Sequence, residues 1–144
     1  MRSQIFRFVM FCFFVLSLFF INSIESGFTF SLFAREKECD VFYFSKKPQD
    51  DSNYVGLFYL NKQESDCDVG GLVILSRDVS VLEVAEFFNA KLVSFEKVED
   101  LKIFYLYTAL LPKNIDLNGK KFNLQVIFDK NNVKIAYPIN FAGF

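Results

Sequence analysis

The stretch that decides the fold is Lys121-Phe-Asn-Leu-Gln-Val-Ile-Phe-Asp-Lys-Asn-Asn-Val-Lys-Ile-Ala-Tyr-Pro-Ile-Asn-Phe141. Phe122, Leu124, Val126 and Phe128 alternate with Asn123, Gln125 and Asp129. A second alternation pairs Val133, Ile135, Tyr137, Ile139 and Phe141 with Lys134, Ala136 and Asn140. A period of two is typical of a strand with one buried face. Because the polar residues Lys130-Asn131-Asn132 separate the two runs, the sequence predicts an antiparallel hairpin. Pro138 has no backbone N–H, which predicts that the second strand lies at a sheet edge.

Further strands are predicted upstream of this hairpin. Short β-branched and aromatic runs, bounded by turn residues, indicate strands at Cys39–Ser45, Tyr54–Leu60, Leu72–Leu75, Lys91–Val98 and Lys102–Leu111. Asn118-Gly119 favours a tight turn, because both residues tolerate a positive φ. Residues 36–144 contain no internal repeat or linker, so we expect them to form one domain.

One helix is signalled inside this domain. Ser80-Val-Leu-Glu83 has the spacing of a capping box, and Val81, Val84, Ala85 and Phe88 follow at helical spacing. A helix of about ten residues is marginal alone, so it must pack on the sheet. The predicted fold is therefore α+β: a mostly antiparallel β-sheet with one short helix packed on a face, preceded by an N-terminal hydrophobic helix.

The first 27 residues predict a signal peptide or a signal anchor. Arg2 and Arg7 precede an uncharged run of fourteen apolar or small residues, from Phe8 to Ile21. A basic start followed by an apolar stretch of this length is typical of secretory signals. The positive-inside rule keeps the arginines cytoplasmic and places the rest of the chain outside, membrane-anchored or secreted. Two outcomes stay open: cleavage near Ser26 or Gly27, and retention as an anchor.

Charge and composition exclude several classes of function. From Gly27 onward 14 basic residues stand against 16 acidic ones, so we expect no binding to nucleic acid driven by counterion release. The chain contains no histidine, which excludes Ser-His-Asp and Cys-His catalysis and imidazole zinc sites. No glycine-rich phosphate loop follows a strand, and we expect no nucleotide, metal or other cofactor.

Two cysteines of the exported part, Cys39 and Cys67, form a possible disulfide. An even cysteine count in an oxidising compartment favours a bridge, which would pin the first strand to the loop after the second. Two separate thiols are the alternative, since disulfides are less usual on Gram-positive surfaces. Near Cys67, the alternating acids Glu64, Asp66 and Asp68 resemble a calcium loop but lack its glycine and closing glutamate, so we interpret them as a solvated turn.

Asn123 and Gln125 point away from the apolar face of their predicted strand. They are the best candidates for a polar contact surface, although solvation alone would also explain their position.

The C-terminal part of the chain resembles a known family. The segments Lys121–Val126 and Ala136–Ile139, with a terminal aromatic residue, are similar to the Asn-Leu-Gln and Gly-x-Pro-Ile strands of the YwmB family of exported Firmicutes proteins. Ala85–Ala90 takes the place of that family's last helix. The resemblance covers roughly residues 80–144; Ala136 replaces the family's usual glycine, and a second half-domain is missing. The resemblance implies export and a sheet likened to TATA-box-binding proteins, but no active-site residue, because fold does not imply function.

These observations favour a non-enzymatic cell-envelope protein. Its domain would act as a binding or structural module, in contact with the membrane through the N-terminal segment and with another envelope protein. The alternative is a divergent hydrolase that uses two carboxylates brought together by folding. A deep cleft with two acids would favour the hydrolase, whereas an exposed strand edge at 133–144 would favour strand addition by a partner.

Overall fold

The computed structural model describes residues 1–22, 26–46, 53–55, 58–62, 69–76, 78–141 and 143. The helices are α1 (Arg2–Asn22), α2 (Ser26–Lys37) and α3 (Val81–Phe87). The strands are β1 (Val41–Ser45), β2 (Asn53–Val55), β3 (Phe58–Asn61), β4 (Gly70–Leu75), β5 (Lys91–Val98), β6 (Leu101–Tyr107), β7 (Ile115–Leu117), β8 (Lys120–Phe122), β9 (Leu124–Phe128) and β10 (Val133–Tyr137).

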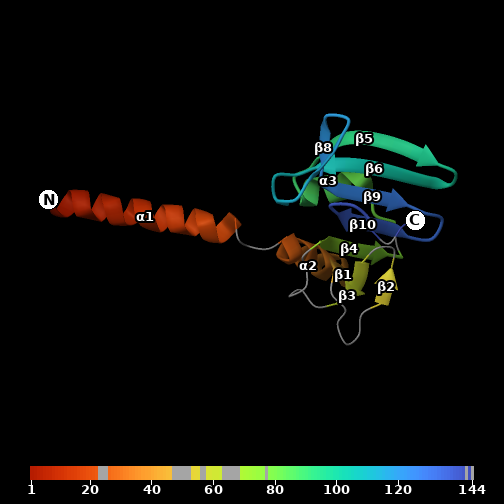
Figure 1. Cartoon of the computed structure of the whole chain (residues 1–144), viewed down its shortest axis with the longest axis horizontal. Coiled ribbons are helices and arrows are strands. Elements are labelled where there is room, and N and C mark those ends of the chain that lie inside the picture. Colours follow the sequence, from red (N-terminus) through yellow and green to blue (C-terminus); the bar gives the residue numbers. More distant parts are fainter. Residues whose placement is uncertain are drawn as a thin grey trace.

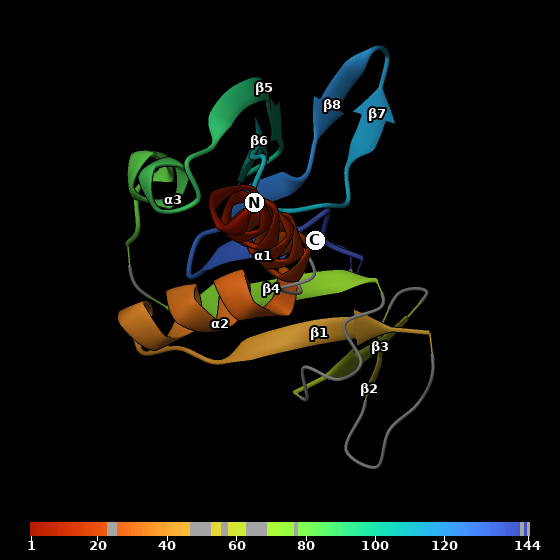
Figure 2. The same cartoon turned by 90° about the vertical axis from the view of Figure 1, so that its left-hand side faces the viewer.

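Eight of the strands form one antiparallel sheet with the order β2-β3-β1-β4-β10-β9-β6-β5, and β7 pairs with β8 in a small separate hairpin. The hairpin predicted from the C-terminal alternation is confirmed, with Val133 opposite Phe128 and Ile135 opposite Val126. The small β7–β8 hairpin projects from the rest of the domain (Figure 2). Its turn residues Asn118 and Gly119 both have positive φ, as predicted.

The predicted edge position of the last strand is wrong. β10 lies in the middle of the sheet, paired on one side with β4 and on the other with β9. Pro138 follows Tyr137, the last paired residue, so its missing N–H removes no ladder hydrogen bond. At this point the two backbones come very close, because a Cβ on Gly70 would lie 1.8 Å from the Tyr137 carbonyl oxygen. Only glycine fits there.

Two predicted strands are broken into shorter ones. The segment Tyr54–Leu60 is divided between β2 and β3, which pair with each other as a hairpin. The run Phe122–Phe128 is interrupted at Asn123, which separates β8 from β9. The Asn123 side chain forms hydrogen bonds with Thr108 and Leu111, in the loop after β6.

The predicted helix is confirmed as α3, together with its capping box. The Ser80 hydroxyl accepts a hydrogen bond from the Glu83 backbone N–H at 3.2 Å, and the Ser80 N–H donates to the Glu83 carboxylate at 2.9 Å. Val84 and Phe88 point into the core with 0% exposure. α3 therefore packs one face on the sheet, as its apolar spacing predicts.

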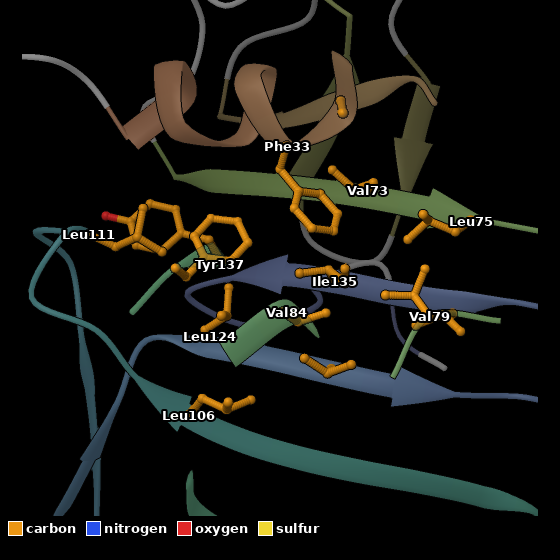
Figure 3. Packing of buried hydrophobic residues seen from close by; sticks show 14 residues of the cluster. Phe33, Val73, Leu75, Val79, Val84, Leu106, Leu111, Leu124, Ile135 and Tyr137 are labelled. Carbon is orange, nitrogen blue, oxygen red and sulfur yellow. The ribbon is translucent and has the colours of Figure 1, made fainter. Parts of the chain in front are cut away.

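The predicted fold is wrong in one respect: α3 is not the sheet's single helix. α2 lies along β4 and β1 (Figure 2) and buries Phe33 completely. The Phe33 ring lies 5.0 Å from Phe87 and 5.4 Å from Phe88 of the α3 segment. Figure 3 shows Phe33 pointing at Val73 and toward the strand that carries Ile135. A seven-residue α3 is too short to cover this sheet face, so α2 covers its other half.

The opposite face of the sheet holds a smaller core. Phe44, Leu72 and Ala136 are buried there. The chain after β10 covers them, because the Phe141 ring lies 5.4 Å from Phe44 and 4.8 Å from Phe58. The sheet is thus covered on both faces, by helices on one side and by the C-terminal tail on part of the other.

α1 stands away from this domain (Figure 1). From Ile5 to Leu16 its large apolar side chains are exposed on all sides of the helix, with values between 54% and 72% for Ile5, Phe6, Phe8, Val9, Met10, Phe11, Phe13, Phe14 and Leu16. In the described part of the chain, no helix combines the length and the apolar character needed to span a membrane.

The core position of Phe33 gives a stability prediction. Phe33→Ala should lower the free energy of unfolding by about 3–5 kcal/mol, because it leaves a cavity between both helices and the sheet. The matched control is Leu32→Ala, since Leu32 is the adjacent α2 residue but is 43% exposed. Urea unfolding of the full chain in detergent micelles, followed by circular dichroism, measures both. Equal effects for the two variants would mean that α2 does not belong to the core.

Candidate functional site

Of the two cysteines predicted to form a disulfide, Cys39 lies within the described residues. Cys39 follows the end of α2, where its thiol donates to the Ala34 carbonyl at 3.6 Å. Cys67 lies outside the described residues, as do Glu64, Asp66 and Asp68. The disulfide therefore stays a prediction. Within the described ranges, no three His, Cys, Asp or Glu side chains come together in a way that could hold a metal ion.

An open cavity of about 790 Å³ lies where α2 meets β1 and β4. Its walls are formed by Ala34, Arg35, Lys37, Glu38, Cys39, Asp40, Phe42, Ile74, Leu75 and Ser76. The α2 terminus shapes it: the Cys39 N–H bonds to the Ala34 carbonyl at 2.9 Å, and Glu38 adopts a φ of 56°. This is a Schellman-type helix end with glutamate where glycine is usual.

The cavity is lined by both basic and acidic side chains, and its acidic side chains are exposed to solvent. Lys37 lies 3.8 Å from the Glu83 carboxylate, which links the end of α2 to the start of α3. Asp40 lies 3.8 Å from Lys62 in an exposed ion pair. Glu38 and Asp40, the two carboxylates of the cavity, are both exposed.

The predicted contact residues Asn123 and Gln125 are buried, with exposures of 0% and 4%. The Asn123 carbonyl accepts from the Thr108 N–H at 2.9 Å, and its amide donates to the carbonyls of Thr108 and Leu111 at 2.7 and 2.8 Å. The Asn123 side chain therefore provides hydrogen-bond partners for three backbone groups of the loop after β6. Asn123 holds this loop in place and presents nothing to a partner.

Gln125 belongs to a second internal network, on the opposite sheet face. Its carbonyl oxygen accepts from the Asn140 N–H at 2.8 Å, which fastens the C-terminal tail to β9. Gln125 also hydrogen-bonds to the Tyr105 hydroxyl, which donates to the Glu96 carboxylate. The network thus runs from the tail through β9 and β6 to β5. Burial, together with the nearby Glu96 carboxylate, raises the pKa of Tyr105 to about 12.

Strand β5 is one of the two edges of the eight-stranded sheet and is paired on one side only, with β6. Leu92, Phe95 and Val98 of this strand are all substantially exposed, with Phe95 at 50%. The pairing shifts between Leu92 and Ser94, which marks a β-bulge. The sequence pattern predicted this strand but not its edge position, because strand order depends on contacts between segments that are distant along the chain.

Comparison with known proteins gave no match to a protein-family model, to a curated protein or to a solved structure. The resemblance to the YwmB family therefore rests on the short motifs of the C-terminal part and stays a prediction. In the structure these motifs correspond to β8, β9, β10 and the residues that follow β10.

The Asn123 network gives a second stability prediction. Asn123→Ala should lower the free energy of unfolding by about 3 kcal/mol, because the Thr108 N–H and two carbonyls lose their partner in a buried place. Asn131→Ala is the control, since Asn131 is exposed in the β9–β10 turn and should change stability by less than about 0.5 kcal/mol. Thermal or urea unfolding of the full chain distinguishes the two. If Asn123→Ala lowered the free energy of unfolding no more than Asn131→Ala does, the assigned hydrogen-bond network would be wrong.

The raised pKa of Tyr105 predicts how stability changes at high pH. Between pH 10 and about 12 the native state keeps a proton that the unfolded chain has lost, so stability falls as the pH rises. Tyrosinate absorbance of the wild type, compared with that of Tyr105→Phe, reports this titration. Glu96→Gln should lower the pKa only in part, because burial is the larger cause. Glu99→Gln, a change in the β5–β6 turn, should leave the pKa as it is. Titration of Tyr105 near pH 10 in the wild type would refute the network.

Proposed function

We propose that this chain is an extracytoplasmic cell-envelope protein, in which the N-terminal segment directs export and the domain is a non-catalytic binding or structural module. The observation that carries the proposal is the apolar surface of α1. Large apolar side chains are exposed on every side of that helix, and α1 stands away from the domain (Figure 1). Such a helix has no polar face to turn toward water, so it needs an apolar environment outside its own domain.

The distribution of charge along α1 supports an export signal. Arg2 and Arg7 lie at its start, and the run from Phe8 to Ile21 that follows is uncharged. Signals of this kind need an apolar stretch of roughly 7–15 residues, shorter than the ~20 residues of a full span. The segment would lead the chain across the membrane and then either be removed or hold the domain at the membrane surface.

Cleavage near Ser26 or Gly27 is compatible with the fold. The buried α2 side chains that the structure describes are Phe33 and Ala34, so a cut near Ser26 or Gly27 removes α1 and leaves the contacts of Phe33 with Phe87 and Phe88 intact. Both forms of the protein, anchored and released, would therefore contain the same folded domain. The resemblance of the C-terminal part to the exported YwmB family supports the same location.

The domain is better suited to binding than to catalysis. The chain has no histidine, and the two carboxylates that line the cavity are exposed. No feature of the described residues favours the hydrolase alternative over a module that presents its surface to another envelope component.

Reversing the charge at the start of α1 tests the proposal. Arg2→Glu with Arg7→Glu should strongly reduce export, because the positive-inside rule then no longer fixes the orientation. External protease digestion of intact cells, followed by detection of a C-terminal tag, measures the exported fraction. Lys120→Glu with Lys121→Glu makes the same charge change in the exposed β8 strand and should leave export unchanged. Equal export of both double variants, or a wild-type protein fully protected inside cells, would overturn the proposal.

A further inference from the structure

The edge strand β5 is open along only part of its length. The bulge between Leu92 and Ser94 disturbs its first half, and bulges of this kind protect strand edges from unwanted pairing. From Ser94 to Val98 the strand pairs regularly with β6, residue against residue. Its outer backbone groups in this stretch therefore have the geometry to bind one more strand.

Two lysines lie opposite each other at this open stretch, on the face that also carries Phe95. Lys97 lies directly opposite Lys102 of β6, and neither forms an ion pair with any residue that the structure describes. Like charges directly opposite each other in a sheet are destabilising. Of the acidic side chains nearby, Asp100 pairs with Lys130 at 2.8 Å, Glu96 accepts from Tyr105, and Glu99 in the β5–β6 turn forms no ion pair with either lysine. A carboxylate supplied from outside would relieve the repulsion between Lys97 and Lys102.

An aromatic row lies beside the lysines. The rings of Phe95 and Phe104 are 4.8 Å apart, and those of Phe104 and Phe128 are 5.6 Å apart. Phe128 and Phe104 pack against the main core, whereas Phe95 ends the row half exposed at the sheet edge. Because Phe95 and Lys97 are two residues apart, they point to the same face of the sheet. A strand added to β5 would place one apolar side chain beside Phe95 and one carboxylate beside Lys97.

We propose that β5 binds an extended acidic segment of a partner protein, which adds to the sheet as a ninth strand along Ser94–Val98. Backbone hydrogen bonds would supply most of the affinity, and the Phe95–Lys97 pair would select an apolar residue and an acid two positions apart. Pairing with β5 of a second copy is disfavoured, because it would add that copy's Lys97 and Lys102 to a face where two lysines already lie opposite each other. The inference rests on the proposed function only in treating the domain as a binding module.

A pair of synthetic peptides tests the proposal on the purified full chain in non-ionic detergent micelles. The first is acetyl-Thr-Glu-Thr-Val-Thr-amide, and the second replaces its glutamate with lysine. Backbone amide chemical shifts are followed by NMR as each peptide is added. The glutamate peptide should shift the amides of Ser94–Val98 and bind about fivefold more tightly than the lysine peptide, the ratio expected for one exposed ion pair replaced by repulsion.

Charge-reversed variants sharpen the test. Lys97→Glu with Lys102→Glu should reverse the preference, so that the lysine peptide binds more tightly. Lys120→Glu with Lys121→Glu alters net charge equally but lies outside β5, and should keep the wild-type preference. Equal affinity for both peptides, shifts confined to other strands, or self-association through β5 without peptide would each overturn the proposal. Because the measurement uses purified protein, its failure would be distinct from a failure of export.

Discussion

The domain depends on burying one face of a wide antiparallel sheet, and the contact between Phe33 of α2 and Phe88 at the end of α3 closes that face. Neither helix is long enough to cover the sheet alone. α3 covers the strands toward β9, while α2 covers β4 and β1, and the two helices meet at these rings. Burying a phenylalanine side chain stabilises a fold by about 1.5–3 kcal/mol, a large part of the net stability of a small domain.

Buried polar side chains fix the remaining segments to this core. Asn123 replaces backbone partners for the loop after β6, and Gln125 ties the C-terminal tail to β9. Tyr137 contributes similarly, since its buried hydroxyl accepts from the Lys113 N–H at 2.8 Å. Satisfied polar groups of this kind specify one arrangement of loops, because any other arrangement would leave a buried donor or acceptor unpaired. These hydrogen bonds therefore hold the loops between the short strands in one arrangement.

The local parts of the fold could be predicted from the sequence. A capping box needs only Ser80 and Glu83 at the right spacing, and a hairpin needs only two alternating runs and a turn, so both predictions are confirmed. The place of β10 could not be predicted, because strand order depends on contacts between distant segments such as β4 and β10. α2 was missed because Ser26–Lys37 carries little amphipathic signal and adjoins the apolar leader.

The candidate sites, like the strand order, depend on contacts between distant segments and were therefore poorly predicted. Asn123 and Gln125 looked like surface residues because a polar residue in an alternating strand usually faces water. Both instead face polar groups that the fold brings from 12 to 15 residues away along the chain. The edge character of β5 likewise depends on strand order. The sequence pattern therefore predicted α3 and most of the strands, whereas the edge position of β5 is visible only in the tertiary structure.

The central claim is that an apolar leader delivers a folded domain whose core begins in α2. The measurement that tests it most directly is N-terminal sequencing, with intact-mass analysis, of the protein isolated from outside the cytoplasmic membrane. The account predicts a chain that begins at its first residue or near Ser26 or Gly27, so that Phe33 is retained. A mature chain that begins after Phe33, or a protein found only in the cytoplasm, would contradict it.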